Sequence, residues 1–380
     1  MYYYVTIFRC SIVGSQIRWV EENKILNIIR AIDEGFDAVI EYIREDKISK
    51  LIPIYESTPI PPVIPTIRYG SALIPIEPVG EYRLRDLKDI LQGGSEKIVD
   101  FLEKEEISVV AVDSGTYVSG PHVSIDFAIV NVGYWYFNYG EMIGGGGNKA
   151  RIFVDVEEGT KIQTLAKELE IGIVEELMDR IHGKKVFVLL DESLSLSYTL
   201  SWAEKDRLEI ISKISRLLNS IKSRGAIPIG IFYTRAHDIV RGLSVLRPDT
   251  NITRVPDRAL MDRILGLFGR SQLFMAHSRA IEGSGLRILA FYTKVGERNI
   301  LRVEFPEDLR AYVDDIHFIV VAQSMLGGGY PLPLQRAHDW AVIDAETREF
   351  VIGEICRRLG IPLSEVLYTK KLTRKRTPME

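Results

Sequence analysis

Cysteine, net charge and long apolar runs are all scarce in this sequence. Only 2 cysteines occur among its 380 residues, Cys10 and Cys356, and they lie far apart in the chain. Two distant cysteines exclude a disulfide framework and a cysteine-based zinc site, and they suit a reducing compartment. We therefore expect a cytoplasmic protein.

Signals for membranes and secretion are also missing. No run of about 18 apolar residues occurs, so no membrane association is expected. The first residues lack the cationic start and cleavage site of a signal peptide. The net charge is only −4, so any nucleic-acid-binding surface has to come from local basic patches rather than from overall charge.

The chain is expected to divide into an N-terminal extension and a larger functional domain. Apolar residues recur at helical spacing over residues 21–43, and residues 86–104 predict a second helix. Prolines are frequent between Pro53 and Pro65, which predicts an extended connector. We expect residues 1–105 to form an extension used for dimer or partner contacts, and residues 106–380 to form the functional domain.

The larger part alternates strands and helices in the manner of a mixed α/β sheet. Strands are expected at residues 107–113, 122–136, 150–157, 185–191 and 227–233, a turn at 144–147, and helices at 161–181 and 203–224. This order predicts an α/β fold with a mixed sheet and flanking helices. Further on we expect a helix at 257–268, strands at 287–293 and 299–305, and a long C-terminal helix at 335–359.

Two of the apolar strands end in an aspartate. Asp113 follows Val-Ala-Val and precedes Ser-Gly, and Asp191 follows Val-Leu-Leu and precedes Glu-Ser. Ligands of open α/β sheets bind beyond the carboxyl ends of the strands, so both carboxylates point to one site. Such a pair suits Mg²⁺ or Mn²⁺, and two ions would clamp a phosphodiester. The alternative is that each aspartate only caps a turn.

A third acidic ligand is expected from the helix at residues 161–181. Glu170 lies beside the apolar face of that helix, where a carboxylate needs a partner such as a metal ion. Glu175 and Glu176 lie further round the helix and read as solvated, although they stay open as alternatives for the ligand.

The C-terminal part contains a distinctive segment that runs from Gly327 to His338. Its sequence, Gly-Gly-Gly-Tyr330-Pro-Leu-Pro-Leu-Gln-Arg-Ala-His338, combines tight-turn glycines with prolines at the start of a helix. Tyr330 and His338 would then face one pocket, where the histidine ligates a metal or donates to a phosphate. The alternative is that His338 is an ordinary surface histidine and that Tyr330 only packs at a corner of the chain.

Taken together, these segments resemble the archaeal NurA nuclease family. The resemblance runs from about Val109 to Thr377 and includes the strands that end in Asp113 and Asp191, a helix glutamate, and the Tyr330–His338 segment. It also includes a segment with Val-Pro-Asp257 and Gly-Arg270-Ser, followed by a basic tail at residues 370–376.

The resemblance implies an RNase H-like core and Mn²⁺- or Mg²⁺-dependent cleavage of DNA, with two ions expected. It implies a 5′→3′ exonuclease and single-strand endonuclease in DNA end resection and recombinational repair. It also implies a homodimer that docks on a hexameric HerA-type ATPase. The family's metal and catalytic positions carry over onto Asp113, Glu170, Asp191, Tyr330 and His338, with all but Tyr330 as metal ligands.

One departure from the family pattern leaves other functions open. The family usually has Asp-Gly-Ser after these strands, whereas this chain has Asp113-Ser-Gly and Asp191-Glu192-Ser. Glu192 adds a negative charge beside a proposed ligand. An inactive NurA-like scaffold that only binds the translocase is therefore one alternative, and another RNase H-like nuclease or a junction resolvase is the second.

Basic side chains have to bring DNA to an acidic centre of this kind. The candidates are Arg235, Arg270, Arg336 and the basic tail. The aromatic run from Tyr134 to Phe137 would offer base stacking, although such a run on a strand is more often used for packing.

Overall fold

The computed structural model describes residues 47–67, 70–84, 87–120, 123, 126–154, 160–248, 250, 254–360 and 362. The chain divides into two compact units, residues 1–50 and 51–380, and the second contains the sheet described below. The helix predicted at residues 21–43 and the basic tail at 370–376 lie outside the described residues. The division at residue 105 stays a prediction.

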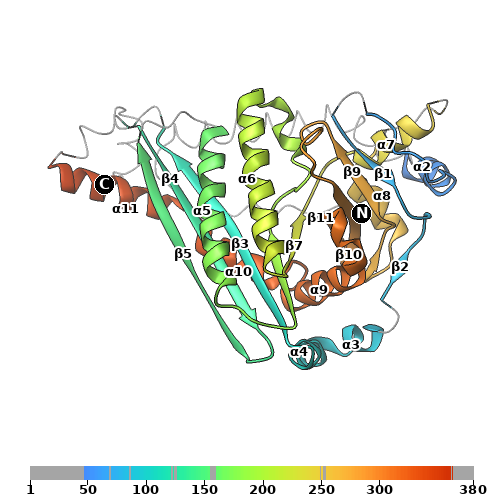
Figure 1. Ribbon diagram of the computed structural model, residues 1–380, viewed down its shortest axis with the longest axis horizontal. Helices are drawn as coiled ribbons and strands as arrows, with labels where there is room; N and C mark the ends of the chain where they lie inside the picture. Colours follow the sequence, from blue (N-terminus) through green and yellow to red (C-terminus); the bar gives the residue numbers. More distant parts are fainter. Residues whose placement is uncertain are drawn as a thin grey trace, which may run out of the picture. The chain divides into compact units, whose positions relative to one another are not determined.

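A mixed sheet of 11 strands is the centre of the described part of the second unit (Figure 1). Its main path runs β1-β9-β10-β11-β7-β6-β3-β4-β5. The half of the path that matters for the site consists of β3 (Ile107–Val118), β4 (Phe127–Asn138), β5 (Ile143–Val154), β6 (Lys185–Leu190) and β7 (Ile227–Phe232). β3, β4 and β5 are antiparallel, whereas β6 pairs in parallel with both β3 and β7. The predicted mixed α/β sheet with flanking helices is thus confirmed.

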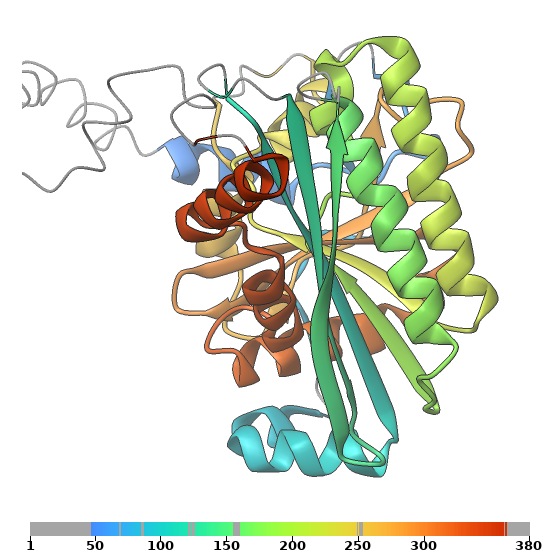
Figure 2. The same cartoon turned by 90° about the vertical axis from the view of Figure 1, so that its left-hand side faces the viewer.

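Helices cover both faces of this half of the sheet (Figure 2). On one face lie α5 (Thr160–Met178) and α6 (Glu204–Ser223), close to the predicted bounds because their apolar residues recur at helical spacing. On the other face lie α9 (Val313–Leu326) and α10 (Leu332–Ala341). None of the helices in the described ranges is long and apolar enough to cross a membrane.

The other half of the sheet is antiparallel and was only partly predicted. It contains β9 (Phe274–Ser278), β10 (Ile288–Gly296) and β11 (Asn299–Pro306), with the short β8 (Gly269–Arg270) alongside. β1 (Ser71–Pro75) pairs with β9, and β2 (Tyr82–Arg83) pairs with β8. Residues from before the predicted boundary at 105 therefore take part in the same sheet.

The described residues form several further helices. The C-terminal helix that was predicted as one piece is two, α10 and α11 (Ala345–Leu359), because Asp344 caps a new helix by accepting from the backbone of Thr347 at 2.7 Å. The remaining helices are α2 (Lys47–Glu56), α3 (Lys88–Gln92), α4 (Gly94–Lys104), α7 (Asp238–Leu246), α8 (Asp257–Ile264) and the short 3₁₀ segments η2 (Ser197–Ser201) and η3 (Glu307–Tyr312).

Two predictions in the N-terminal third were wrong. Pro53 lies inside α2 instead of an extended connector, and the buried Tyr55 of that helix donates to Gln272 at 2.5 Å. This tertiary contact outweighs the loss of one helical hydrogen bond at proline. The helix predicted at residues 86–104 is broken into α3 and α4 because Gly94 has a φ of +82°.

The turn predicted at Gly144–Gly147 is also wrong, because these glycines belong to strand β5. In the register of the two strands they pair with the aromatic run of β4, Tyr134, Trp135, Tyr136 and Phe137. A Cβ on Gly144 would lie 2.3 Å from the Phe137 ring, so the glycines leave room for aromatic rings to lie across the edge strand. The chain turns earlier, where Met142 donates to the carbonyl of Tyr139.

A buried histidine gives the fold a predictable acid sensitivity. His317 of α9 is 1 % exposed and contacts the hydroxyl of Thr293 through Nε2 at 3.2 Å. Burial, with the positive charge of Arg270, lowers the pKa of His317 to about 3. The folded pKa is therefore below that of the unfolded chain. The resulting stability is present above the unfolded pKa and is lost as the pH falls towards 3.

We expect wild type to lose about 2 kcal/mol of unfolding free energy from this one group between pH 7.5 and pH 5. The His317→Gln variant places an amide nitrogen near Thr293 and does not titrate. Between pH 7.5 and pH 5 it should therefore lose about 2 kcal/mol less unfolding free energy than wild type. Urea unfolding of both proteins at the two pH values measures the difference. Equal losses in the two proteins would contradict this assignment.

Candidate active site at the end of β6

The register of two parallel strands brings Asp113 and Asp191 together. Val112 of β3 pairs with Leu190 of β6, so the next residue on each strand is an aspartate at the same level. Side chains alternate along a strand, and neighbouring parallel strands lie about 4.8 Å apart. Both carboxylates therefore point to the same face of the sheet, and both line one cavity of about 440 Å³.

Asp113 does not end its strand, contrary to the expectation. β3 continues to Val118 because β4 still pairs with it there, whereas β6 stops at Leu190. Asp113 thus lies where β3 loses its parallel neighbour, and a space opens at the end of β6. Residues Ser114 and Gly115 are strand residues rather than turn residues.

The distinctive C-terminal segment reaches the same place. His338 of α10 contacts Asp113 through Nδ1 and Oδ2 at 2.7 Å. The hydroxyl of Tyr330 donates to Oδ1 of Asp191 at 2.8 Å and lies 3.2 Å from the carbonyl of Ile231. The structure therefore brings together four of the five residues that the sequence nominated as catalytic. His338 is 62 % exposed, so its ring is also open to a ligand.

Burial and neighbouring charge shift the ionisation of this group. Burial raises the pKa of Asp191; the hydroxyl of Tyr330 opposes this shift, and the negative charge of Asp113 adds to it. The pKa of Tyr330 is raised by burial and by the adjacent Asp191. Tyr330 is therefore a hydrogen-bond donor at neutral pH, not a phenolate.

The ring of Tyr330 is held by a residue that the sequence did not nominate. Tyr233, just after β7, stacks on Tyr330 with the ring centroids 5.3 Å apart and an angle of 24°. Its hydroxyl donates to the carbonyl of Gly329 at 3.3 Å, and the guanidinium of Arg258 lies 5.7 Å from its centroid. No pattern in the sequence near Tyr233 marks this role, because it depends on a contact 97 residues away.

Glu170, on helix α5, lines the same cavity as Asp113 and Asp191. The neighbouring candidates are occupied elsewhere: Glu176 pairs with Lys149, and Glu175 accepts from Ser220. Glu170 is only 4 % exposed and is ion-paired with Lys167, which also donates to Glu192 at 2.7 Å. Neither Lys167 nor this pairing was foreseen, since it joins a helix to the loop after β6.

The pKa values of Lys167 and Glu192 are shifted by burial and by opposite charge. Burial alone would lower the pKa of Lys167, but the carboxylates of Glu170 and Glu192 outweigh it and hold the pKa above its usual value. Burial raises the pKa of Glu192 to about 7, against the opposing charge of Lys167.

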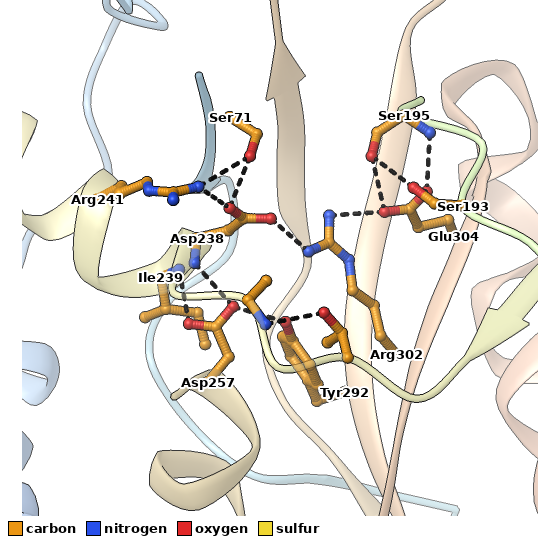
Figure 3. Close-up of polar contacts among 12 residues, drawn as sticks. Ser71, Ser193, Ser195, Asp238, Ile239, Arg241, Asp257, Tyr292, Arg302 and Glu304 are labelled. Atoms are coloured by element: carbon orange, nitrogen blue, oxygen red, sulfur yellow. Dashed lines mark hydrogen bonds and ion pairs between the residues drawn. The ribbon is translucent and has the colours of Figure 1, made fainter. Parts of the chain in front are cut away.

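The loop that carries Asp191 and Glu192 is anchored by a buried ion-pair network (Figure 3). Glu304 of β11 accepts from the backbone N–H of Ser195 at 2.9 Å and from its hydroxyl at 3.0 Å. Arg302 lies 2.6 Å from Glu304 and 2.6 Å from Asp238. The loop is therefore fixed from the antiparallel half of the sheet.

Asp257, part of the segment quoted for the family resemblance, belongs to the same network (Figure 3). Its carboxylate accepts from the backbone N–H groups of Asp238 and Ile239 at the start of α7, and from the hydroxyl of Tyr292 at 2.8 Å. Burial, with the charge of Asp238, raises the pKa of Asp257 to about 7. Its contacts give it a structural role.

The three arginines nominated for DNA contacts lie in different environments. Arg270 is 3 % exposed, pairs with Glu77 at 3.0 Å and lies over the ring of Tyr82. A guanidinium that is buried and ion-paired in this way is not exposed to a phosphate of DNA. Arg235 and Arg336 are exposed, and Arg336 lies on α10 close in sequence to His338.

Two glycines let α10 lie directly on the sheet. Gly133 is the β4 partner of Asp113, and a Cβ there would lie 2.1 Å from the carbonyl oxygen of Ala337. A Cβ on Gly115 would lie 2.2 Å from the carbonyl oxygen of Ala341. Any side chain at these positions would push α10, and His338 with it, away from Asp113.

We expect Gly133→Ala to displace α10 and to destabilise the protein by about 1–3 kcal/mol, the usual cost of overpacking. Gly120→Ala is the matched control, because a Cβ at Gly120 meets no atom within 4 Å. Urea unfolding curves of the two variants measure the difference. If both were as stable as wild type, α10 would not be held by this close approach.

Comparisons with known proteins identify the family and support the fold. The NurA domain family model matches residues 107–343. The structure is similar to that of the NurA nuclease from Sulfolobus solfataricus, with a TM-score of 0.54 and 16% sequence identity. The match covers 89% of this chain and 97% of that chain, and it supports the fold.

Two other solved structures have lower TM-scores. A NurA structure with manganese has a TM-score of 0.41 and 13% identity, covering 75% of this chain and 98% of that one. Endonuclease V of Ciona intestinalis has a TM-score of 0.35 and 9% identity, covering 70% of this chain and 99% of that one. No curated protein matches the sequence. Because the family model covers more than half of the chain, the chain belongs to the NurA family.

Proposed function

We propose that this protein is a divalent-metal-dependent nuclease that hydrolyses phosphodiester bonds of DNA beside Asp113 and Asp191. Membership in the NurA family supports a nuclease. The observation that carries the proposal is the register of β3 and β6, which places two aspartates side by side at the wall of an open cavity.

The donor set fits a hard cation. Carboxylate oxygens are the ligands that Mg²⁺ and Mn²⁺ prefer, and Mg²⁺ is often held by one or two carboxylates together with waters and substrate phosphates. In the part of the chain that the structure describes, no group of three or more His, Cys, Asp or Glu side chains is arranged to hold a metal. Asp113 and Asp191 would therefore hold the ion with waters completing its coordination shell, and a substrate phosphate would replace some of these waters when DNA binds.

Each side chain then has a role that its contacts support. A bound ion would offset the negative charge that develops on the phosphate during cleavage. Tyr330 holds Asp191 in place and would position the scissile phosphate with its hydroxyl. His338 orients Asp113, and its exposed ring would ligate the ion or donate to a phosphate oxygen.

Other features of the proposal rest on the family resemblance. They are 5′→3′ exonuclease and single-strand endonuclease activity, dependence on Mn²⁺ or Mg²⁺, a homodimer, and a HerA-type ATPase partner in end resection and recombinational repair. A cytoplasmic location is proposed separately, from the scarcity of cysteine. Arg235 and Arg336 are exposed and are the arginines proposed to contact DNA.

One observation favours a second function, a weakly active or inactive scaffold. Glu170, which the sequence nominated as a metal ligand, is already ion-paired with Lys167. An RNase H-like enzyme with another substrate, such as an RNA–DNA hybrid or a four-way junction, would use the same aspartates.

The test is cleavage of end-labelled single-stranded and duplex DNA by the purified protein with Mn²⁺. We expect activity in wild type and a loss of at least about 100-fold in Asp113→Asn and Asp191→Asn, because each removes a charged ligand of the ion. Asp308→Asn is the control, because this exposed carboxylate pairs with Lys222 outside the cavity.

Unchanged cleavage in the two site variants would reject the site. No cleavage by wild type would favour the scaffold. Faster cleavage of an RNA–DNA hybrid or a four-way junction, tested in parallel, would change the substrate class.

A further inference from the structure

A lysine occupies the space between two acidic side chains of the proposed active site. Lys167 lies on α5, one helical turn before Glu170, and its side chain is 9 % exposed. Its ammonium is within hydrogen-bond distance of Glu170 Oε2 and 2.7 Å from Glu192 Oε1. The two carboxylates come from different elements, the helix and the loop after β6, and the ammonium links them.

The cavity holds more acid than this one lysine balances. Among the residues that the structure describes, the lining includes four carboxylates, those of Asp113, Glu170, Asp191 and Glu192, and one cationic side chain, Lys167. Lys167 pairs with the two glutamates, and the two aspartates are contacted by His338 and Tyr330. The cavity is thus divided into a glutamate pair with a fixed cation and an aspartate pair without one.

An ammonium and a divalent ion cannot both sit between Glu170 and Glu192. Mg²⁺ binds carboxylate oxygens at about 2.0–2.1 Å, so an ion there needs the space that the Lys167 nitrogen fills. Lys167 also keeps Glu170 away from the two aspartates. If Glu170 moved towards them, the buried ammonium of Lys167 would keep only Glu192 as a partner. A buried charge that loses its partner is strongly unfavourable.

We propose that the ammonium of Lys167 takes the place of a second divalent ion, so that each chain binds one ion, at Asp113 and Asp191. This inference rests on the proposed metal-dependent function and refines it: the two-ion expectation is replaced by one exchangeable ion and one cation built into the protein. Lys167 is then a positioning residue, which keeps Glu170 and Glu192 in place.

Counting bound Mn²⁺ tests the inference without any activity measurement. Free Mn²⁺ is measured by electron paramagnetic resonance during titration of the full-length protein. We expect one ion per wild-type chain and two ions per chain in Lys167→Met, which keeps the unbranched apolar stem of the side chain but removes the ammonium and so frees both glutamates. Lys161→Met, an exposed lysine on the same helix, is the control and should bind one.

A second variant covers the case in which Lys167→Met does not fold. Glu170→Gln keeps Lys167 and should bind one Mn²⁺ with an affinity within about threefold of wild type, because Glu170 is not a ligand while Lys167 holds it. Two ions per wild-type chain, one ion in folded Lys167→Met, or a loss of affinity of tenfold or more in Glu170→Gln would each overturn the inference.

The outcomes also separate this inference from the proposed function. Two ions on wild type would leave a metal-dependent nuclease intact and reject only the role of Lys167. No bound ion on wild type, with the same result in Asp113→Asn, would reject both.

Discussion

The pairing of β3 with β6 is the constraint on which the rest of the site depends. The strands align Val112 with Leu190, and the strand alternation then puts the next two side chains on one face. A slip of one residue would send one aspartate to the opposite face. The apolar residues before each aspartate, such as Val110 and Leu189, are fully buried and hold that register.

The two halves of the sheet contribute different residues to the site. The half with β3 to β7 supplies the aspartates, and its glycines at 115 and 133 admit α10 with His338. The antiparallel half supplies Glu304, whose carboxylate holds the loop after Asp191 through Ser195. Buried ion pairs seldom add much net stability, but breaking one is costly, which makes Arg302 and Glu304 a rigid support for that loop.

Much of the core and part of the site follow from local sequence pattern. Apolar runs of strand length ending in aspartate predicted β3, β6 and their convergence, and helical spacing predicted α5 and α6. α9 was not predicted, because its residues from Ile316 to Ala322 are buried on all sides and show no amphipathic period. The first part of strand β5, Gly144–Gly147, was mistaken for a turn because these glycines are explained only by the aromatic rings of β4.

The contacts that tune the site are those that sequence pattern does not reveal. Lys167 reads as an ordinary helix lysine until the loop with Glu192 is placed against it, and Tyr233 reads as a strand end until Tyr330 stacks on it. The burial of Arg270 against Glu77 is likewise not visible in the local Gly-Arg-Ser segment from which a phosphate contact was predicted. Each case depends on residues more than 20 positions apart, beyond the reach of local periodicity.

The proposed function requires that Asp113 and Asp191 share a divalent ion. Anomalous diffraction from crystals of the protein soaked in Mn²⁺ would locate such an ion. We expect a manganese peak within ligand distance of both carboxylates, at about 2.0–2.6 Å for hard cations of this kind. Crystals in which manganese binds only elsewhere, or in which the two carboxylates point apart, would contradict it.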